Sequence, residues 1–184
     1  MCEKWINEYV VVDLETTGLD IQRDEIIEIA AVKVKRGLVV DTFQTLVRCD
    51  KAIPAEVSSL TGITEAMLSE QPDIWDVLPG FSDFVGETNL VAHNAAFDRA
   101  FLHKYWPDER QWLDTLILSQ IVFPCLPTYS LANLTASLNI PNAPAHRALS
   151  LSLIHISMCI RDRARGYRVR CYSVDPPLCR AGCW

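Results

Sequence analysis

Two carboxylates separated by a single residue, Asp13 and Glu15, are the first feature of the sequence that could carry out chemistry. They close a run of mostly β-branched residues, Tyr9 to Leu14, that predicts a buried strand. Side chains two apart in a strand point to the same face, so the two carboxylates should lie close together. Such a pair repels unless a cation lies between them, and oxygen ligands suit Mg²⁺ or Mn²⁺. Taken alone, the pair is more often two solvated charges at a strand end.

A third carboxylate, Asp98, lies in the run from Leu90 to Asp98. This run predicts a short strand, a turn at His93-Asn94 and then a helix, with Asp98 one helical turn from its start. If the two strands are neighbours, Asp98 can face the end of the first strand. Without that neighbour, Asp98 would most often be an ordinary surface residue.

Together these segments resemble the DEDDh exonucleases, a family with a ribonuclease-H-like fold that includes the proofreading subunit and proofreading domains of bacterial DNA polymerase III. Residues Asp13 to Gly18 resemble the first motif of the family, and His93 to Asp98 resemble the second. Residues Ala145 to Leu149 resemble the start of the third, and Leu60 to Thr64 also fit. A narrower resemblance is to the N-terminal exonuclease domain of DinG-like helicases, through Trp112 to Leu116, Phe123-Pro124 and Tyr129 to Leu131.

The resemblance implies a metal-dependent 3′-to-5′ exonuclease of the proofreading or repair type, which hydrolyses phosphodiester bonds at the 3′ end of DNA, or of RNA. Asp13, Glu15 and Asp98 would be catalytic residues and ligands of two Mg²⁺ or Mn²⁺ ions. In that arrangement one ion activates the attacking water and the other stabilises the leaving 3′ oxygen. His146 would be the general base, a role that suits an imidazole.

The resemblance also implies contacts with the nucleic acid. Thr16, Thr17 and Gly18 would contact the terminal nucleotide through main-chain groups. Leu19 would lie against the terminal base, and Asn94 would supply a polar contact. The expected partner is the 3′ end of single-stranded DNA, with a helicase or polymerase module in the native full-length protein. Turn formation and helix capping explain these five residues about as well.

The sequence departs from the family at the third motif, which requires an aspartate five residues after the histidine. Position 151 is Leu151. The following residues resemble translated sequencing-adapter DNA, and all six of their basic residues are arginine. We therefore expect residues 1–150 to be a C-terminally truncated exonuclease domain and residues 151–184 to be a disordered, artefactual tail. The alternative is a catalytically impaired nucleic-acid-binding module.

The charge distribution divides the chain at the same place. Residues 1–150 hold 21 acidic and 11 basic side chains, whereas residues 151–184 hold 2 and 6. An acidic domain cannot hold nucleic acid by a broad basic face, so divalent metals must bridge the repulsion. No uncharged apolar run is long enough to span a membrane and no signal peptide precedes the domain, which predicts a cytoplasmic protein without a membrane partner.

The elements that must position these residues can be read from the remaining pattern. Two strands, Glu25 to Lys35 and Leu38 to Val47, should form a hairpin around Arg36-Gly37. A helix is expected over Asp73 to Val85, with Pro79-Gly80 bending it or delaying its start. Further helices and strands are expected at Ile53–Leu60, Leu90–Ala92, 95–105, 112–123 and 129–138. This order predicts an α/β fold, a ribonuclease-H-like mixed five-stranded sheet flanked by helices.

Overall fold

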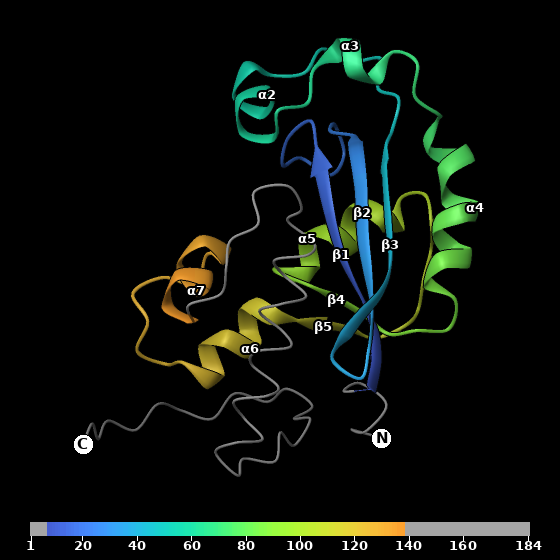
Figure 1. Cartoon of the computed structure of the whole chain (residues 1–184). Helices are drawn as coiled ribbons and strands as arrows, with labels where there is room; N and C mark the ends of the chain where they lie inside the picture. The colour runs from blue at the N-terminus through green and yellow to red at the C-terminus, as the bar shows by residue number, and fades with distance from the viewer. Residues whose placement is uncertain (1–6, 139–184) are drawn as a thin grey trace.

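The computed structural model of the chain describes residues 7–138, which build a five-stranded mixed sheet in the order β3-β2-β1-β4-β5 (Figure 1). The central strand is β1 (Glu8–Thr16), antiparallel to β2 (Ile26–Lys35) and parallel to β4 (Leu90–Ala92). The edges are β3 (Leu38–Leu46), antiparallel to β2, and β5 (Trp112–Asp114), parallel to β4. The predicted mixed five-stranded sheet is confirmed.

The hairpin between β2 and β3 turns at the dipeptide that the sequence indicated. Arg36 and Gly37 have φ angles of 52° and 79°, and Lys35 is paired with Leu38. Two central residues with positive φ match the twist of a two-residue hairpin, and glycine adopts this conformation without steric cost. The first three strands therefore follow one another directly as a meander.

One face of the sheet is covered by α4 (Ile74–Val85) and α5 (Ala95–His103). Apolar side chains from β1 and β2 pack there against both helices. The largest core cluster includes Val10, Val12, Leu14, Ile26, Ile29, Ala31, Val77, Leu78, Phe81, Val85, Phe101 and Leu102. Burial of this apolar surface is the main term that holds the helices on the sheet.

The opposite face carries the alternate side chains of β1. Tyr9 and Val11 are buried there in a second cluster, against which Leu131 of α7 (Leu131–Leu138) packs. Because strand side chains alternate, Asp13 and Glu15 belong to this second face and to the C-terminal end of the strand. The helix between β5 and α7 is α6 (Thr115–Val122).

Two short helices, α2 (Ala55–Thr61) and α3 (Glu65–Leu68), lie beyond the C-terminal end of β1 (Figure 1). They enclose a separate small core made by Ile27, Ile53, Ile63 and Leu68. Pro54 occupies the N-cap of α2, close to the predicted start, and Gly62 ends the helix with a φ of 77°. This unit packs against the sheet through Ile27 of β2.

Pro79-Gly80 was expected either to bend a helix or to delay its start, and the delayed start was wrong. α4 begins at Ile74 and continues through Pro79 to Val85. The Asp73 side chain caps the helix by accepting a hydrogen bond from the Trp75 amide at 3.0 Å, and buried apolar residues lie on both sides of the proline. Packing and capping outweigh the cost of proline here. Among the helices of residues 7–138, none is long and apolar enough to cross a membrane.

Candidate active site

The two carboxylates of the first motif lie near the end of the central strand. Asp13 and Glu15 are paired in the sheet with Ala30 and Glu28 of β2, and the register shifts directly after Glu15. Both carboxylates are partly exposed on the same face, as the sequence predicted. Glu28, directly opposite Glu15, accepts a hydrogen bond from the Gln44 side chain at 2.8 Å. The strand end is therefore strongly acidic.

The third carboxylate reaches this strand end from α5. Asp98 lies in the first turn of the helix, is 5% exposed, and accepts a hydrogen bond through Oδ1 from the Leu14 amide at 3.1 Å. Burial, and next the negative charge of Asp13, raise the pKa of Asp98 well above its ordinary value. The predicted approach of Asp98 to the first strand is confirmed, and the two carboxyl groups are close enough to repel.

A hard divalent cation suits this arrangement, because carboxylate oxygens are its preferred ligands and its charge would offset the repulsion. Within residues 7–138, however, no three His, Cys, Asp or Glu side chains are grouped closely enough to hold a metal ion by themselves. The predicted general base His146 and the substituted position Leu151 both lie outside the described residues. Their contribution stays a prediction.

The turn after the carboxylates is held by its own side chains. The Thr16 hydroxyl donates to the Gly18 carbonyl at 2.6 Å, and the Thr17 hydroxyl donates to Oδ1 of Asp24 at 3.0 Å. The other oxygen of Asp24 accepts from the Asp20 amide at 2.8 Å. A Cβ at Gly18 would overlap the Asp24 carboxylate. Turn formation thus engages both threonine side chains and the Gly18 carbonyl, and the Thr17 amide donates to the Glu25 carbonyl at 2.9 Å. Contact of this turn with a nucleotide through main-chain groups stays a prediction.

Leu19 and Asn94, the other two predicted substrate contacts, are exposed. Leu19 is 83% exposed at the tip of the turn. Asn94 is a left-handed residue, with a φ of 66°, directly before α5. Their contact with a terminal nucleotide stays a prediction.

Sequence reasoning missed Asp24 and Asp114, which position the motifs. Asp24 holds the turn around Gly18, and Asp114 accepts hydrogen bonds from the amides of Asn94 and Ala95, each at 3.0 Å. Asp114 was detectable in part, because an Asp-Thr pair between a strand and a helix is a common N-cap signal. Its bonds to the second motif depend on neighbouring strands and leave no local signal.

The first residue of the second motif, His93, is a structural residue. Nδ1 of His93 lies 3.0 Å from the Thr115 hydroxyl, and Nε2 lies 2.9 Å from the Tyr129 carbonyl. Burial lowers the pKa of His93, so the ring is neutral near pH 7. The neutral ring links the end of β4 to the segment that precedes α7.

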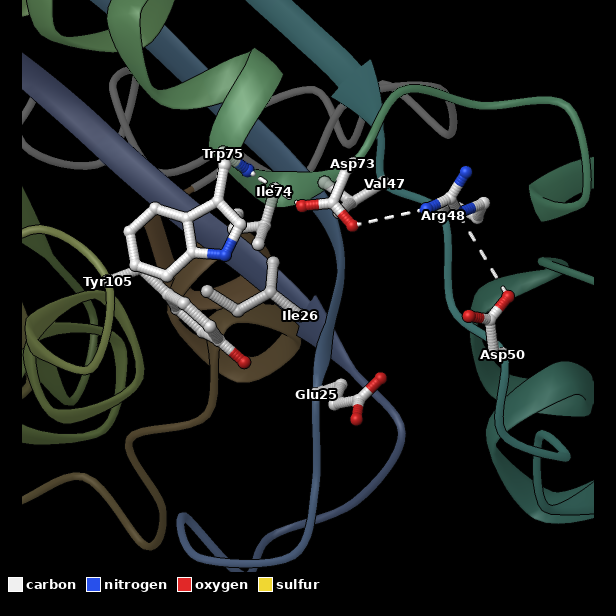
Figure 2. A pocket seen from close by; sticks show the side chains of 9 residues that line it. All are labelled: Glu25, Ile26, Val47, Arg48, Asp50, Asp73, Ile74, Trp75 and Tyr105. Atoms are coloured by element: carbon white, nitrogen blue, oxygen red, sulfur yellow. Dashed lines mark hydrogen bonds and ion pairs between the residues drawn. The ribbon is translucent and has the colours of Figure 1, made fainter.

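A cavity of about 230 Å³ lies elsewhere, between the start of β2, the end of β3 and the start of α4 (Figure 2). Arg48 stands between Asp50 and Asp73 at 4.0 and 3.4 Å, and Glu25 pairs with Lys51 at 2.7 Å. None of Asp13, Glu15 and Asp98 lines this cavity. Since its carboxylates are already paired with cations, the cavity is not the site that the motifs predict.

Comparison with known proteins agrees with this geometry. The exonuclease family model named RNase T matches residues 10–150. The DNA polymerase III subunit epsilon of Aquifex aeolicus is 42% identical over 147 residues, covering 77% of this chain and 73% of the relative. A PolC-type DNA polymerase III of Clostridium perfringens is 43% identical over 152 residues, covering 80% of this chain. The chain spans only 10% of the length of that second relative.

Among solved structures, the nuclease domain of 3′hExo, described as a DEDDh family member bound to rAMP, superposes with a TM-score of 0.72. The match covers 90% of this chain and 96% of that domain, at 22% sequence identity. At this identity the likeness establishes the fold, a ribonuclease-H-like sheet flanked by helices.

Proposed function

The chain belongs to the RNase T family of exonucleases, and on that premise we propose that residues 9 to about 150 form a 3′-to-5′ exonuclease domain that hydrolyses nucleic acid from a free 3′ end. Enzymes of the DEDDh type generally depend on divalent metal ions. The domain therefore has to assemble its acidic residues at one point of the fold.

One observation carries the proposal. The Asp98 carboxylate is buried against the strand that bears Asp13 and Glu15, and it is bonded to the amide between them. A buried carboxylate beside another negative charge is costly for folding. Such arrangements cluster at functional sites. The approach joins the first two family motifs at the end of the central strand.

Asp13, Glu15 and Asp98 would supply ligands to the metal, for which we propose Mg²⁺ or Mn²⁺, two ions in all. Within residues 7–138 these three side chains are not grouped closely enough to hold an ion by themselves. When bound, the ions would supply positive charge at the phosphodiester and lower the pKa of water. His146 would accept the proton of the attacking water. Main-chain groups of Thr16, Thr17 and Gly18, with Leu19 and Asn94, would position the terminal nucleotide for in-line attack.

The proposed substrate is the 3′ end of DNA, single-stranded at the site. It is supported by the likeness to a DNA polymerase III subunit. The acidic composition of residues 1–150 excludes a broad basic binding face, so recognition has to concentrate at the terminal nucleotide and the metals. We propose that the domain works in the cytoplasm alongside a polymerase or helicase module.

We further propose that residues 151–184 are not part of the native enzyme. The family match ends at residue 150, directly before the position where an aspartate is replaced by Leu151. If the tail is native, loss of this ligand should weaken metal binding and slow turnover by orders of magnitude. Resequencing the source locus across codon 150 decides this. A reading frame that continues with an aspartate supports the proposal, and confirmation of Leu151 contradicts it.

The activity is tested by replacing Leu151→Asp together with a family-like final helix, and assaying a 5′-labelled single-stranded oligonucleotide with Mg²⁺. We expect a ladder of products shortened from the 3′ end. The same chain with Asp13→Ala should be inactive, which separates the activity from a contaminating nuclease. A repaired chain that folds but leaves the oligonucleotide intact overturns the enzyme proposal.

A further inference from the structure

The carboxylate of Asp114 binds the N-termini of two helices at once. Oδ1 accepts a hydrogen bond from the Leu116 amide at 2.8 Å, which caps α6, and a second one from the Asn94 amide at 3.0 Å. Oδ2 accepts from the Ala95 amide at 3.0 Å. Asp114 ends β5, which is the neighbour of β4, and so lies beside the start of α5.

The start of α5 depends on this carboxylate because its own N-cap residue supplies no side-chain hydrogen bond. Asn94 occupies that position in the left-handed conformation. The first amides of a helix have no partner within the helix and carry partial positive charge. A negatively charged acceptor supplied from another strand satisfies both needs and leaves the Asn94 side chain out of the cap.

The second hydrogen-bonding link comes from the residue after Asp114. The Thr115 hydroxyl lies 3.2 Å from the Ala92 carbonyl and 3.0 Å from the His93 ring. Both Thr115 and Ala92 are fully buried. The whole connection from the end of β4 to the start of α5 is therefore fixed from the β5 side, by two consecutive residues.

The position of Asp98 follows from this attachment. Ala95 and Asp98 lie in the same first turn of α5, one bonded to Asp114 and the other to the Leu14 amide of β1. The turn is thus held between β5 on one side and β1 on the other. A shift of the helix start on loss of the Asp114 bonds would move Asp98 away from the amide between Asp13 and Glu15.

We propose that Asp114 is a positioning residue, which sets Asp98 against β1 by capping α5 from the neighbouring strand. The effect on hydrolysis rests on the function proposed above, whereas the effect on the placement of Asp98 does not. Misplacement of a reacting group by about 1 Å can slow catalysis on the order of a hundredfold. We therefore expect the main effect of losing the Asp114 bonds to be on turnover.

Hydrogen exchange of the Leu14 amide in the full chain of 184 residues tests the proposal, because that amide reports where Asp98 lies and is not in contact with Asp114. We expect Asp114→Ala to speed the exchange of Leu14 and Ala95 by about tenfold or more. Asp114→Asn, which keeps one acceptor oxygen, should give an intermediate effect. The matched control is Asp73→Ala, which removes the side-chain cap of α4 and should leave the Leu14 amide unchanged.

An unchanged Leu14 amide in folded Asp114→Ala overturns the proposal, as does equal acceleration in Asp73→Ala. If Asp114→Ala does not fold, Asp114→Asn decides: faster exchange at Ala95 without any change at Leu14 overturns the proposal. In the repaired chain, Asp114→Asn should lower kcat by a larger factor than it raises KM, because Asp114 also binds the amide of Asn94. A repaired parent without activity contradicts the proposed function alone, since the exchange result stands independently of it.

Discussion

The main-chain amide of Leu14 donates a hydrogen bond to the carboxylate of Asp98 across a separation of 84 residues. The strand that carries Asp13 and Glu15 thus holds the third carboxylate with its own backbone. The bond favours the charged form of Asp98, but burial and the charge of Asp13 outweigh it and raise the pKa. The charge of Asp98 is therefore a cost, which metal binding would offset.

Asp98→Asn should therefore stabilise the metal-free protein at neutral pH. The folded state raises the pKa of Asp98 above its ordinary value of 3.8, so it holds the proton more tightly than the unfolded chain does. The stability contributed by the protonated group is complete below that value and is lost as pH rises through the folded-state pKa. Asparagine keeps the bond from the Leu14 amide and does not titrate.

Thermal denaturation in chelator, from pH 5 to 8, measures this effect. The difference in Tm between Asp98→Asn and the parent should grow as pH rises. Glu56→Gln, on the exposed surface of α2, is a control for removal of one carboxylate. If the Tm of the parent and the Tm of Asp98→Asn depend on pH in the same way, the charge of Asp98 does not destabilise the folded protein.

Gly18→Ala should destabilise the first-motif turn. The new Cβ would overlap the Asp24 carboxylate, which must move and weaken its bonds from Thr17 and Asp20. We expect a loss of about 1–3 kcal/mol, typical of overpacking. Urea denaturation measures it. Gly80→Ala, within α4, is the control, because the new Cβ would meet only the Phe43 side chain of β3, at 3.8 Å. Alanine is also more favourable than glycine inside a helix by about 1 kcal/mol.

Combining Gly18→Ala with Asp24→Ala tests whether the overlap with Asp24 causes the destabilisation. If the overlap with Asp24 is responsible, the glycine substitution should cost less in the Asp24→Ala background than in the parent chain. Equal costs in the two backgrounds would rule out the overlap, and the turn would then have to require glycine for another reason.

Arg110→Met should destabilise the connection between α4 and β4. Arg110 pairs with Asp108 at 2.6 Å and donates to the carbonyls of Gly86 and Thr88 at 2.7 and 3.1 Å. One carboxylate oxygen of Asp108 is already buried without a hydrogen-bond partner. Loss of the guanidinium leaves a poorly solvated charge, for which we expect a cost of about 2–4 kcal/mol.

The double variant Arg110→Met with Asp108→Asn should recover part of that loss in the same urea experiment, because no unpaired charge remains. If the asparagine substitution recovers nothing, the carbonyl contacts of Arg110, and not its ion pair, account for the stability.

The sequence predicted the local parts of this site. Alternation places Asp13 and Glu15 on one face whatever the strand pairs with, and positive φ at Arg36 and Gly37 follows from hairpin chemistry. The helical position of Asp98 follows from the turn at Asn94. The resemblance to a family then supplied the pairing of the two segments.

What the sequence could not predict depends on contacts between distant segments. The role of Asp114 requires β5 to lie beside β4, and the continuity of α4 through Pro79 requires a buried face that the local cost of proline does not reveal. Local propensity is a weak guide where tertiary packing is strong. The same limit explains why Asp24 could not be connected with Gly18.

The sheet order also sets the sequence of events in folding. β1, β2 and β3 are consecutive in the chain and pair antiparallel, whereas β4 pairs in parallel with β1 after the crossover through α4, and β5 pairs in parallel with β4 after α5. Contacts between distant segments form slowly because long loops must close first. During translation the meander can form while Asp98 is still inside the ribosome, so the hydrogen bond between Asp98 and the Leu14 amide forms only late in synthesis. Until β4 is synthesised, the central strand β1 has an unpaired edge, and an unpaired edge can pair with another chain.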